Sequence, residues 1–555
     1  MTEKILLKFT KKGINLSPDA YNKIISLDDP LNFSSNLIVK LKSDKFDKHD
    51  LISVRSEIVD DLIKSMNLKT DNTTEKEIKT NDTDIKNIDK EKAQRSIMDT
   101  PLSESSKEDK NTKTDDEKFL DEKLERNANT EAEEVDLSSK NKFKRNLEKT
   151  DVEYDFEIIQ DTSNKSYTSG EIDNLITYFK NRYEKIHKML IKRPELKTCQ
   201  KISELEDNQT SFSLILMVKD IRSTKNGHKL IQFEDETGEI AVLVSNKDEE
   251  LFKRAGNLVK DEVVGVVADR NGDLAIAKNI ISPDIQRVKS KEMDFGIVFL
   301  SDIHIGSLTF LEDAFLKFVD WINCEVGTEK QLEVASKVKY LVIGGDIVDG
   351  IGIYPNQDKE LGIKDITAQY DEAARLLGNI RSDIKIIIAP GNHDASRVAE
   401  PQPAVPEKYA KSLYELDNVE FISNPGVVSL DGINVLVYHG RSFDDMAMSV
   451  KELSHERNDI IMEELLKKRH LAPIYGERTP LASELEDYLV IDQVPDVFHT
   501  GHVHINTYRK YNGIHLINSG TFQTQTEFQK IYNIIPTPAE VPVLDRGKYK
   551  LLKFI

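Results

Sequence analysis

Polar side chains that can bind metal ions or transfer protons follow five apolar segments in the C-terminal half of the chain. The segments "FGIVFL", "KYLVI", "IKIIIAP", "INVLVY" and "PDVF" lead into "SDIH", "GGDIVD", "GNHD", "HGR" and "HTGHVH". Each cluster alone is also typical of a turn or a hydrogen-bonded pair. Five such clusters in succession, each at the end of an apolar strand, predict a metal centre. The candidate ligands are Asp302, His304, Asp346, Asn392, His439, His502 and His504.

The chemistry of these side chains indicates which reaction the site could catalyse. Seven ligands are too many for one tetrahedral ion but suit two ions that share a ligand. Carboxylate, imidazole and carboxamide groups without thiolate favour Mn, Fe or Zn over a soft metal. Two such ions can hold a hydroxide and clamp the oxygens of a phosphoryl group, which predicts hydrolysis at phosphorus. His393, beside Asn392, is a candidate general acid, and Asp349 is a candidate to hold the His393 ring in the right tautomer.

The last cluster, "HTGHVH", contains histidines of two kinds. His502 and His504 are two positions apart, so an extended backbone would direct both rings to the same side. Gly501 would let the chain turn sharply beside them. His499 lies outside the ligand pattern, and we expect a packed or hydrogen-bonded neighbour there.

These groups need a scaffold that gathers distant strand ends. Short, nearly continuous apolar strands with helical stretches between them predict a sheet covered on both faces. Functional groups collected beyond strand ends are typical of a layered α/β enzyme. This half contains no Gly-x-Ser-x-Gly elbow, Walker loop or dinucleotide-binding glycine pattern, which argues against serine nucleophile and ATP chemistry.

Residues 206–287 have a different periodicity. Two β-type segments, "FSLILMVKDI" and "HKLIQFED", flank an Asn-Gly turn, and "IAVLVS", a helical "DEELFKRAG" and the hairpin "EVVGVVADRNGDLAIA" follow. Three strands, a helix and two strands is the order of an OB barrel, a fold that often binds nucleic acid. The alternative is a structural spacer, because fold alone does not establish function.

The N-terminal third divides into three predicted parts. Residues 1–68 show helical spacing, as in "SEIVDDLIKSM", and predict a small helical module. Residues 69–150 predict a disordered linker, because 39 of the 80 residues from 71 to 150 are charged and only two are aromatic. Residues 151–205 predict a helical connector, in which "TSGEIDNLITYFKNRYEKIHKMLIKR" starts with a capping box of Thr168 and Glu171 and continues with an apolar stripe that includes Ile172 and Ile176.

The length, net charge and composition of the chain limit the classes of protein to which it can belong. A chain of 555 residues predicts several folded units. The net charge of −20 argues against nucleic-acid binding by bulk electrostatics but not against a local basic groove. We find no apolar run of membrane-spanning length and no secretory signal, and only two distant cysteines. We therefore expect a protein of the reducing cytoplasm, without a membrane partner.

The motif series "DIH … GDIVD … GNHD … H … GHVH" resembles the calcineurin-like metallophosphoesterase superfamily. The resemblance implies a layered α/β domain at 288–555, with two packed sheets flanked by helices. It implies that Asp302, His304, Asp346 and His504 bind one ion, and that Asp346, Asn392, His439 and His502 bind the second. It also implies that His393 is the catalytic histidine and Asp349 its carboxylate partner.

Six longer stretches make the resemblance more specific. They are "LSDIHIGS", "GGDIVDGIGIYPNQ", "PGNHDASR", "YHGRSFDD", "RHLAPIYGERTP" and "QTEFQKIYNIIPTPAEVPV". With the barrel before them, they resemble the small subunits of archaeal family D DNA polymerases over about residues 200–550. This resemblance implies a 3′–5′ proofreading exonuclease in DNA replication, acting on single-stranded 3′ ends and primer–template DNA. It implies a heterodimer with a large polymerising subunit and two divalent ions, with Mn²⁺ as first choice and Fe, Zn or Mg as alternatives.

Other interpretations stay open at this point. The same metal centre would serve a phosphatase or phosphodiesterase that acts on other substrates, and related eukaryotic subunits have lost their ligands and act as assembly scaffolds. Arg441, just after His439, is a candidate for pairing with a phosphate, or else forms a surface ion pair. A sliding-clamp contact would suit a replication subunit, although the sequence shows no clear clamp-binding motif.

Overall fold

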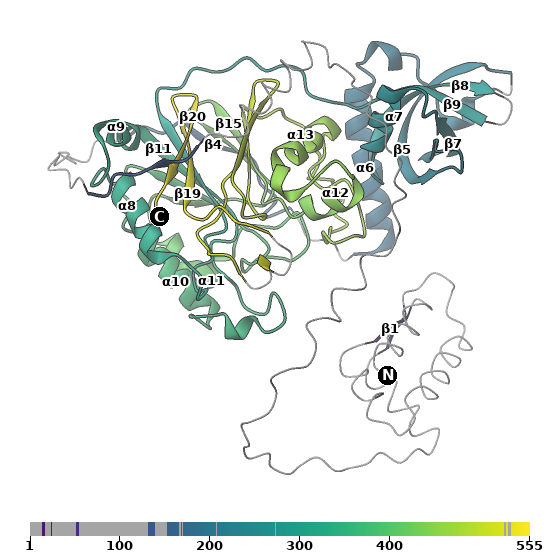
Figure 1. The fold of residues 1–555 in the computed structure, drawn as a ribbon. Helices are drawn as coiled ribbons and strands as arrows, with labels where there is room; N and C mark the ends of the chain where they lie inside the picture. Colours follow the sequence, from purple (N-terminus) through teal and green to yellow (C-terminus); the bar gives the residue numbers. More distant parts are fainter. Residues whose placement is uncertain are drawn as a thin grey trace, which may run out of the picture. The chain divides into compact units, whose positions relative to one another are not determined.

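The chain divides into two compact units, residues 1–110 and 111–555. The computed structural model (Figure 1) describes residues 14–16, 24, 52–54, 131–138, 152–165, 168, 170–206, 208–271, 274–526, 529–530 and 534–555.

In the first unit, strand β1 (Ile14–Leu16) pairs in parallel with β2 (Ile52–Val54). The predicted helical module at 1–68 therefore contains a strand pair, and its expected helix at "SEIVDDLIKSM" lies outside the described residues. Most of the predicted disordered linker, 69–150, also lies outside them.

Five strands close into a barrel in the order β5-β6-β7-β9-β8. The predicted succession of three strands, a helix and two strands is confirmed. Apolar residues alternate into the barrel, and Leu214, Leu216 and Val218 of β5 are fully buried in its core. The elements are β5 (Ser211–Ser223), β6 (Lys229–Asp235), β7 (Gly238–Val244), α7 (Glu249–Gly256), β8 (Val263–Asn271) and β9 (Leu274–Ile281).

Helix α6 (Ile172–Leu190) packs beside the barrel (Figure 1). The predicted capping box is wrong, because the helix starts after Glu171 without a side-chain cap. The predicted stripe is also partly wrong: Ile172 is 78% exposed and Ile176 48% exposed. The buried positions are Tyr178, Arg182, Ile186 and Leu190.

A seven-stranded sheet has the order β13-β12-β11-β10-β19-β20-β3. Its four neighbours β10 to β13 are parallel, as expected for strands joined through helices. Every residue of β10 is buried, in agreement with the prediction of a sheet covered on both faces. The strands are β3 (Glu133–Glu134), β10 (Gly296–Leu300), β11 (Val338–Gly344), β12 (Lys385–Ala389), β13 (Val419–Phe421), β19 (Glu540–Asp545) and β20 (Lys548–Lys553).

A six-stranded sheet has the order β17-β18-β16-β15-β14-β4. Within it, β15, β16 and β18 are parallel neighbours. The strands are β4 (Phe156–Gln160), β14 (Gly426–Leu430), β15 (Ile433–Val437), β16 (Val497–Thr500), β17 (Thr507–Tyr511) and β18 (Ile514–Asn518).

One buried apolar cluster contains side chains from both sheets, among them Phe299 of β10, Val342 of β11 and Val437 of β15. Alternate residues of the seven-stranded sheet, such as Val298 and Leu300, pack instead with helices. Those helices are α8 (Glu312–Ile322), α9 (Glu329–Lys337), α10 (Ile366–Leu377) and α11 (Glu407–Tyr414). The six-stranded sheet packs in the same way on α12 (Phe443–Ser449) and α13 (Asn458–Lys468).

Two predicted boundaries need correction, because edge strands of both sheets come from upstream segments. Residues 131–138, which their charge placed in the predicted linker, contribute β3, which pairs with β20. Val135, just after β3, is buried in the apolar cluster of that sheet and its helices. The predicted helical connector contributes β4, which pairs with β14. Pairing with an existing sheet edge satisfies the backbone of a segment whose own composition does not favour a strand.

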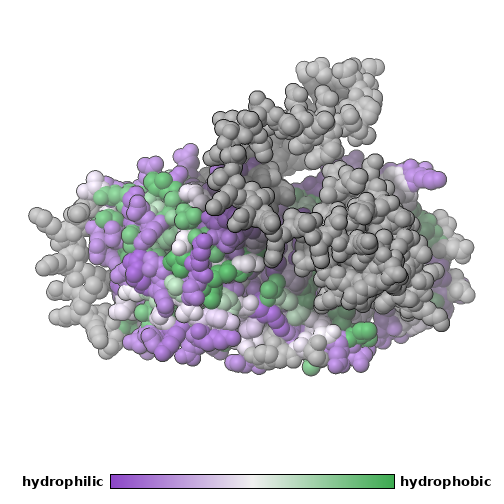
Figure 2. Space-filling model, turned by 90° about the horizontal axis from the view of Figure 1, so that it is seen from below, coloured by the Kyte–Doolittle hydropathy of each residue, from purple (hydrophilic) through white to green (hydrophobic). Residues whose placement is uncertain are grey.

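On the face drawn in Figure 2, hydrophobic side chains form small patches among hydrophilic ones. Within the described ranges, no helix combines the length and the apolar character needed to cross a bilayer.

Candidate metal centre

The predicted ligands follow strands that are parallel neighbours in the two sheets. Three neighbouring strands of the seven-stranded sheet, β10, β11 and β12, precede Asp302, Asp346 and Asn392. Two neighbouring strands of the other sheet, β15 and β16, precede His439 and His502. Since parallel strands end at the same edge, segments separated by up to 200 residues meet at one place.

Asp302, His304 and His504 form one group of possible ligands, whose ligand atoms lie within 4.8 Å of one another. The two Nε2 atoms of His304 and His504 are 3.1 Å apart, and His504 Nε2 lies 3.4 Å from Asp302 Oδ1. Asp346 Oδ2 lies 4.0 Å from His304 Nε2. All four side chains predicted for the first ion therefore come together.

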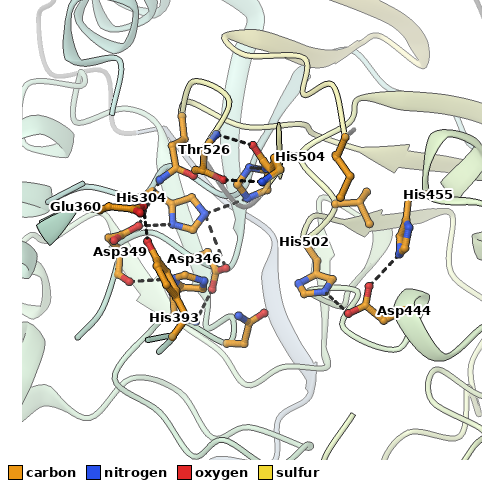
Figure 3. Close-up of a pocket in the computed structure, with 16 residues that line it drawn as sticks. His304, Asp346, Asp349, Glu360, His393, Asp444, His455, His502, His504 and Thr526 are labelled. Carbon is orange, nitrogen blue, oxygen red and sulfur yellow. Dashed lines mark hydrogen bonds and ion pairs between the residues drawn. The ribbon is translucent and has the colours of Figure 1, made fainter. Parts of the chain in front are cut away.

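Asp346 also belongs to a second group. Its Oδ2 lies 3.3 Å from His439 Nε2, and Asn392 Oδ1 lies 3.1 Å from the same nitrogen. The ring of His502 is 5.3 Å from the ring of His439, at the side of the pocket that faces Asp444 (Figure 3). Asp346 thus stands between the two groups, where a shared ligand would have to be.

Hydrogen bonds at the outer nitrogens orient two of the imidazoles. Nδ1 of His304 lies 3.0 Å from the Asp349 carboxylate, and Nδ1 of His439 lies 2.9 Å from the carbonyl oxygen of Gly344. Because both partners only accept, each Nδ1 carries the hydrogen and each Nε2 faces the centre. This is the arrangement in which a histidine binds a metal through Nε2.

The electrostatics of the centre fit divalent cations. Among the described residues, no group donates a hydrogen bond to the buried Oδ1 of Asp302. Burial would raise the pKa of Asp346, but the charge of His439 lowers it well below its ordinary value. Burial would lower the pKa of His439, but Asp346 raises it to about 10. Without a cation the centre thus retains a proton on His439, which a cation would displace.

His393 lines the pocket beside the candidate ligands, and the hydrogen-bond partner of its ring differs from the prediction. Its Nδ1 lies 2.7 Å from the backbone carbonyl oxygen of Asp349, not from the carboxylate, which contacts His304 instead. The carbonyl requires a hydrogen on Nδ1, so Nε2 is the atom that can exchange a proton in the pocket. The ring also lies close enough to His304 and Asp346 to be a possible ligand.

The backbone at "HTGHVH" is not extended, contrary to the prediction. His502 and His504 have φ values of 71° and 60°, in the left-handed region. Gly501 is required for space rather than for its own φ, because a Cβ there would lie 2.4 Å from Asp302 Oδ2. Gly391 is required in the same way, since its Cβ would lie 2.2 Å from Asp346 Oδ1.

Left-handed backbone is concentrated at this centre. Asp302, His304 and Asp346 have φ values of 50°, 56° and 52°. Non-glycine residues adopt this region at a cost and mostly where the surrounding structure demands it, as at functional sites. The strained turns direct each side chain back towards the common centre.

Several contributing residues have no obvious signature in the sequence. Asp444 lies between two histidines, with Oδ1 2.9 Å from His455 Nε2 and Oδ2 3.7 Å from His502 Nε2 (Figure 3). Gln529 Nε2 lies 2.9 Å from Nδ1 of His504. The "DD" after "HGR" could have suggested Asp444, since it is the nearest acidic pair downstream of His439.

Asp394, the last residue of "GNHD", also has a structural role that the prediction missed. Its Oδ2 accepts hydrogen bonds from the backbone N–H groups of Asp346 (2.7 Å) and Gly391 (2.8 Å), and its Oδ1 accepts one from Tyr370 (3.0 Å). Burial, together with the charge of Asp346, raises the pKa of Asp394 to about 6. Asp394 therefore ties the turn after β11 to the turn after β12.

The two remaining expectations concern residues near the centre. His499 is fully buried, 3.0 Å from Ser519 Oγ through Nε2 and packed against Phe299, which confirms a hydrogen-bonded neighbour. Arg441 donates to the backbone carbonyl of Val398 at 3.1 Å, and its pairing with a phosphate stays a prediction.

Comparisons with a family model and with individual proteins agree on one family for this chain. Residues 297–509 match the B-subunit family of DNA polymerases alpha and epsilon. The DNA polymerase II small subunit of Methanothermobacter thermautotrophicus is 52% identical over 553 residues, which cover 99% of both chains. The proteins of that name from Archaeoglobus fulgidus and Methanocaldococcus jannaschii are 45% and 41% identical and align with 70% and 72% of this chain and with 78% and 68% of their own lengths.

The similarity to the Methanothermobacter thermautotrophicus protein extends over nearly the whole of both chains, well beyond the candidate metal centre. The chain therefore belongs to the family of archaeal DNA polymerase II small subunits, the small subunits of family D DNA polymerases.

Proposed function

We propose that this protein is the proofreading subunit of an archaeal replicative DNA polymerase and hydrolyses DNA phosphodiesters from the 3′ end. The domain at 288–555 would be a calcineurin-like phosphoesterase. Its metal ligands would be Asp302, His304, Asp346 and His504 for one ion, and Asp346, Asn392, His439 and His502 for the other. We favour Mn²⁺, with Fe, Zn or Mg as alternatives.

The observation that carries this proposal is the placement of His393. Its ring lines a pocket of about 250 Å³ together with His304, Asp346 and His504. A scaffold subunit needs no proton donor beside a set of metal ligands. A phosphoesterase does, because the alcohol oxygen that leaves phosphorus must take up a proton.

The chain's own groups account for binding, orientation and proton transfer. Divalent cations, when bound, supply Lewis-acid activation of the attacking water and of the phosphate oxygens. The carbonyl of Asp349 fixes the His393 ring, so that a proton on Nε2 can pass to the 3′ oxygen of the shortened strand. Arg441 would pair with a phosphate next to the scissile one.

The barrel and the partner subunit complete the proposal. We assign an OB fold to the barrel at 206–287, and its exposed face would contact the DNA strand that leads to the pocket. A large polymerising subunit would form a heterodimer with this chain and pass mispaired 3′ ends to the pocket. A sliding clamp is a further candidate partner.

The test compares single substitutions in the full chain loaded with Mn²⁺. The substrates are 5′-labelled single-stranded DNA and a primer–template with a mismatched 3′ end, and bound metal is measured by mass spectrometry. We expect His393→Ala to reduce nucleotide release by about 10²–10⁴-fold and to leave both ions bound. Asp346→Asn should lose activity and metal together, because Asp346 is the shared ligand.

His187→Ala, on α6 far from the centre in sequence, is the matched control and should behave as wild type. Hydrolysis of a phosphate monoester without DNA cleavage would replace the proposal with a phosphatase function. No hydrolysis of any substrate, even with the large subunit added, would instead identify an assembly subunit. Loss of metal in His393→Ala would make His393 a ligand rather than the acid.

A further inference from the structure

The lining of the pocket includes aromatic and apolar side chains as well as possible metal ligands. Tyr354, Val503 and Ile534 line the pocket together with the carboxylate and imidazole groups. The ring centroid of Tyr354 lies 6.3 Å from that of His393. The segment that carries Tyr354 also exposes Ile351 (47%) and Ile353 (39%) to solvent. Apolar side chains exposed to water next to a residue that lines the pocket require an explanation.

The segment from 350 to 360 is held in place by several hydrogen bonds. Gln357 donates to the carbonyl and the carboxylate of Asp349, at 2.8 and 3.0 Å, and accepts from Ile353 N at 2.9 Å. Tyr354 donates its hydroxyl hydrogen to Glu360 at 3.0 Å. The chain therefore builds a defined surface here, and this surface presents Ile353 and Tyr354.

This surface adjoins the backbone of His393. A Cβ on Gly350 would lie 2.2 Å from the carbonyl oxygen of His393 and 3.1 Å from Ile353 Cγ1. Ile353 and the turn that carries His393 thus meet at a glycine that nothing larger could replace. The surface formed by Ile353 and Tyr354 therefore adjoins the turn that carries His393.

The proposed reaction places a specific part of DNA at this corner. If His393 protonates the 3′ oxygen of the shortened strand, the nucleotide that carries this oxygen lies against His393. Its base must then rest on whatever surface adjoins the ring. Bases of any sequence stack on aromatic rings and apolar faces, so such a surface would serve a nuclease without sequence preference.

We propose that Tyr354 and Ile353 form a nucleobase subsite for the penultimate nucleotide, on the 5′ side of the scissile phosphate. This assignment rests on the proposed exonuclease function and names how it positions its substrate. Tyr354 acts as a positioning residue: it holds the base, and through the base it holds the 3′ oxygen in reach of His393 Nε2.

The experiment compares two 5′-labelled oligonucleotides that differ only at the penultimate position, thymidine in one and an abasic tetrahydrofuran in the other. The measured quantity is the ratio of the two kcat/KM values for removal of the terminal nucleotide. Wild type should prefer the thymidine substrate by about 5- to 150-fold, the range for one stacked base. In Tyr354→Ala the ratio should fall to about one, mainly through KM.

Three further variants isolate the stacking contribution. Tyr354→Phe loses the hydroxyl bond to Glu360 but retains the ring, and should restore most of the wild-type ratio. Ile353→Ser tests the apolar contact of the base without removing an aromatic ring. It should reduce the ratio less than Tyr354→Ala. Tyr414→Ala, at an exposed tyrosine of α11, is the matched control and should leave the ratio unchanged.

Equal rates of wild type on both oligonucleotides would overturn the subsite while leaving the exonuclease proposal intact. An unchanged ratio in Tyr354→Ala would do the same. If wild type degrades neither oligonucleotide, the exonuclease proposal fails. The dissociation constants of the two oligonucleotides, measured by fluorescence anisotropy, then decide on the subsite, and equal values would overturn it.

Discussion

Two buried clusters of charged and imidazole groups in this chain have similar composition but differ in how far their hydrogen-bonding atoms are satisfied. One is the candidate metal centre. The other lies where α6 meets the domain of the two large sheets and consists of Arg182, Asp487 and His470, all at most 1% exposed. Both clusters join segments far apart in the sequence, since Arg182 and Asp487 are separated by 305 positions.

The α6 cluster satisfies its own hydrogen-bonding groups. Asp487 Oδ2 accepts from Arg182 Nε at 2.7 Å and contacts His470 Nε2 at 2.8 Å, while Leu489 N donates to Oδ1 at 3.0 Å. Arg182 also donates to the hydroxyl of Tyr178 and to two backbone carbonyls. In such a set each of these side chains has a partner, so the cluster holds two parts of the fold together.

The candidate metal centre has possible ligand atoms that face one another. Within the described part of the chain, Asp302 Oδ1 has no donor, and the Nε2 atoms of His304 and His504 stand 3.1 Å apart at the edge of an open pocket. The same residue types therefore stabilise the fold where their lone pairs are filled, and offer a binding site where they are not. Substitutions in each cluster can test this distinction.

The largest effect should come from breaking the closed cluster. Asp487→Ala would leave Arg182 buried and unpaired, so we expect the free energy of unfolding to fall by about 3–5 kcal/mol. Urea denaturation measures this loss, and the metal content of the folded protein should stay as in wild type. Glu486→Ala removes an exposed carboxylate from Lys185, which keeps its pair with Asp492, and should cost less than about 1 kcal/mol. Metal loss at unchanged stability in Asp487→Ala would remove the distinction between the clusters.

A slightly smaller effect should appear as a pH dependence at the buried carboxyl of Glu400. Burial raises its pKa to about 7, although Tyr438 donates to it at 3.0 Å. Because the folded-state pKa lies above the unfolded value, the stability contribution is complete below about pH 4.5 and is lost as pH rises through 7.

Relative to Glu400→Gln, wild type should therefore lose on the order of 3 kcal/mol of unfolding free energy between about pH 4.5 and 7.5. The comparison is made on chelator-treated protein, so that metal binding does not change with pH. A constant difference between the two proteins over this range would show that Glu400 is ionised in the folded protein throughout.

The smallest effect should arise at Asp444, which supports a proposed ligand without being one. Its carboxylate orients His502, and such outer partners typically contribute about 10–100-fold to metal affinity. We therefore expect Asp444→Asn to weaken binding of the second Mn²⁺ by that factor, measured by titration with electron paramagnetic resonance. Asp313→Asn, at an exposed position of α8, is the control. Unchanged affinity at Asp444→Asn would make this residue a structural partner of His455 only.

Much of the centre was predictable because its signal is local. A buried parallel strand must be continuously apolar, and the groups that follow its end are read directly from the sequence around Asp302, Asp346 and His393. The succession of strands and helix in the barrel was predictable for the same reason. Segments without a strong pattern of their own, such as residues 131–138, were mispredicted because their structure depends on an edge that another part of the chain provides.

The sequence alone determined which residues could bind metal and in what order they follow the strands. The tertiary structure decided their partners: that the Asp349 carboxylate faces His304 while its carbonyl holds His393, that Asp444 lies against His502, and that His502 and His504 bend out of an extended path. The physical reason is the distance along the chain over which each interaction acts. Strand formation depends on neighbours along the chain, whereas hydrogen-bond partners and left-handed turns are selected by contacts between segments that meet only after folding.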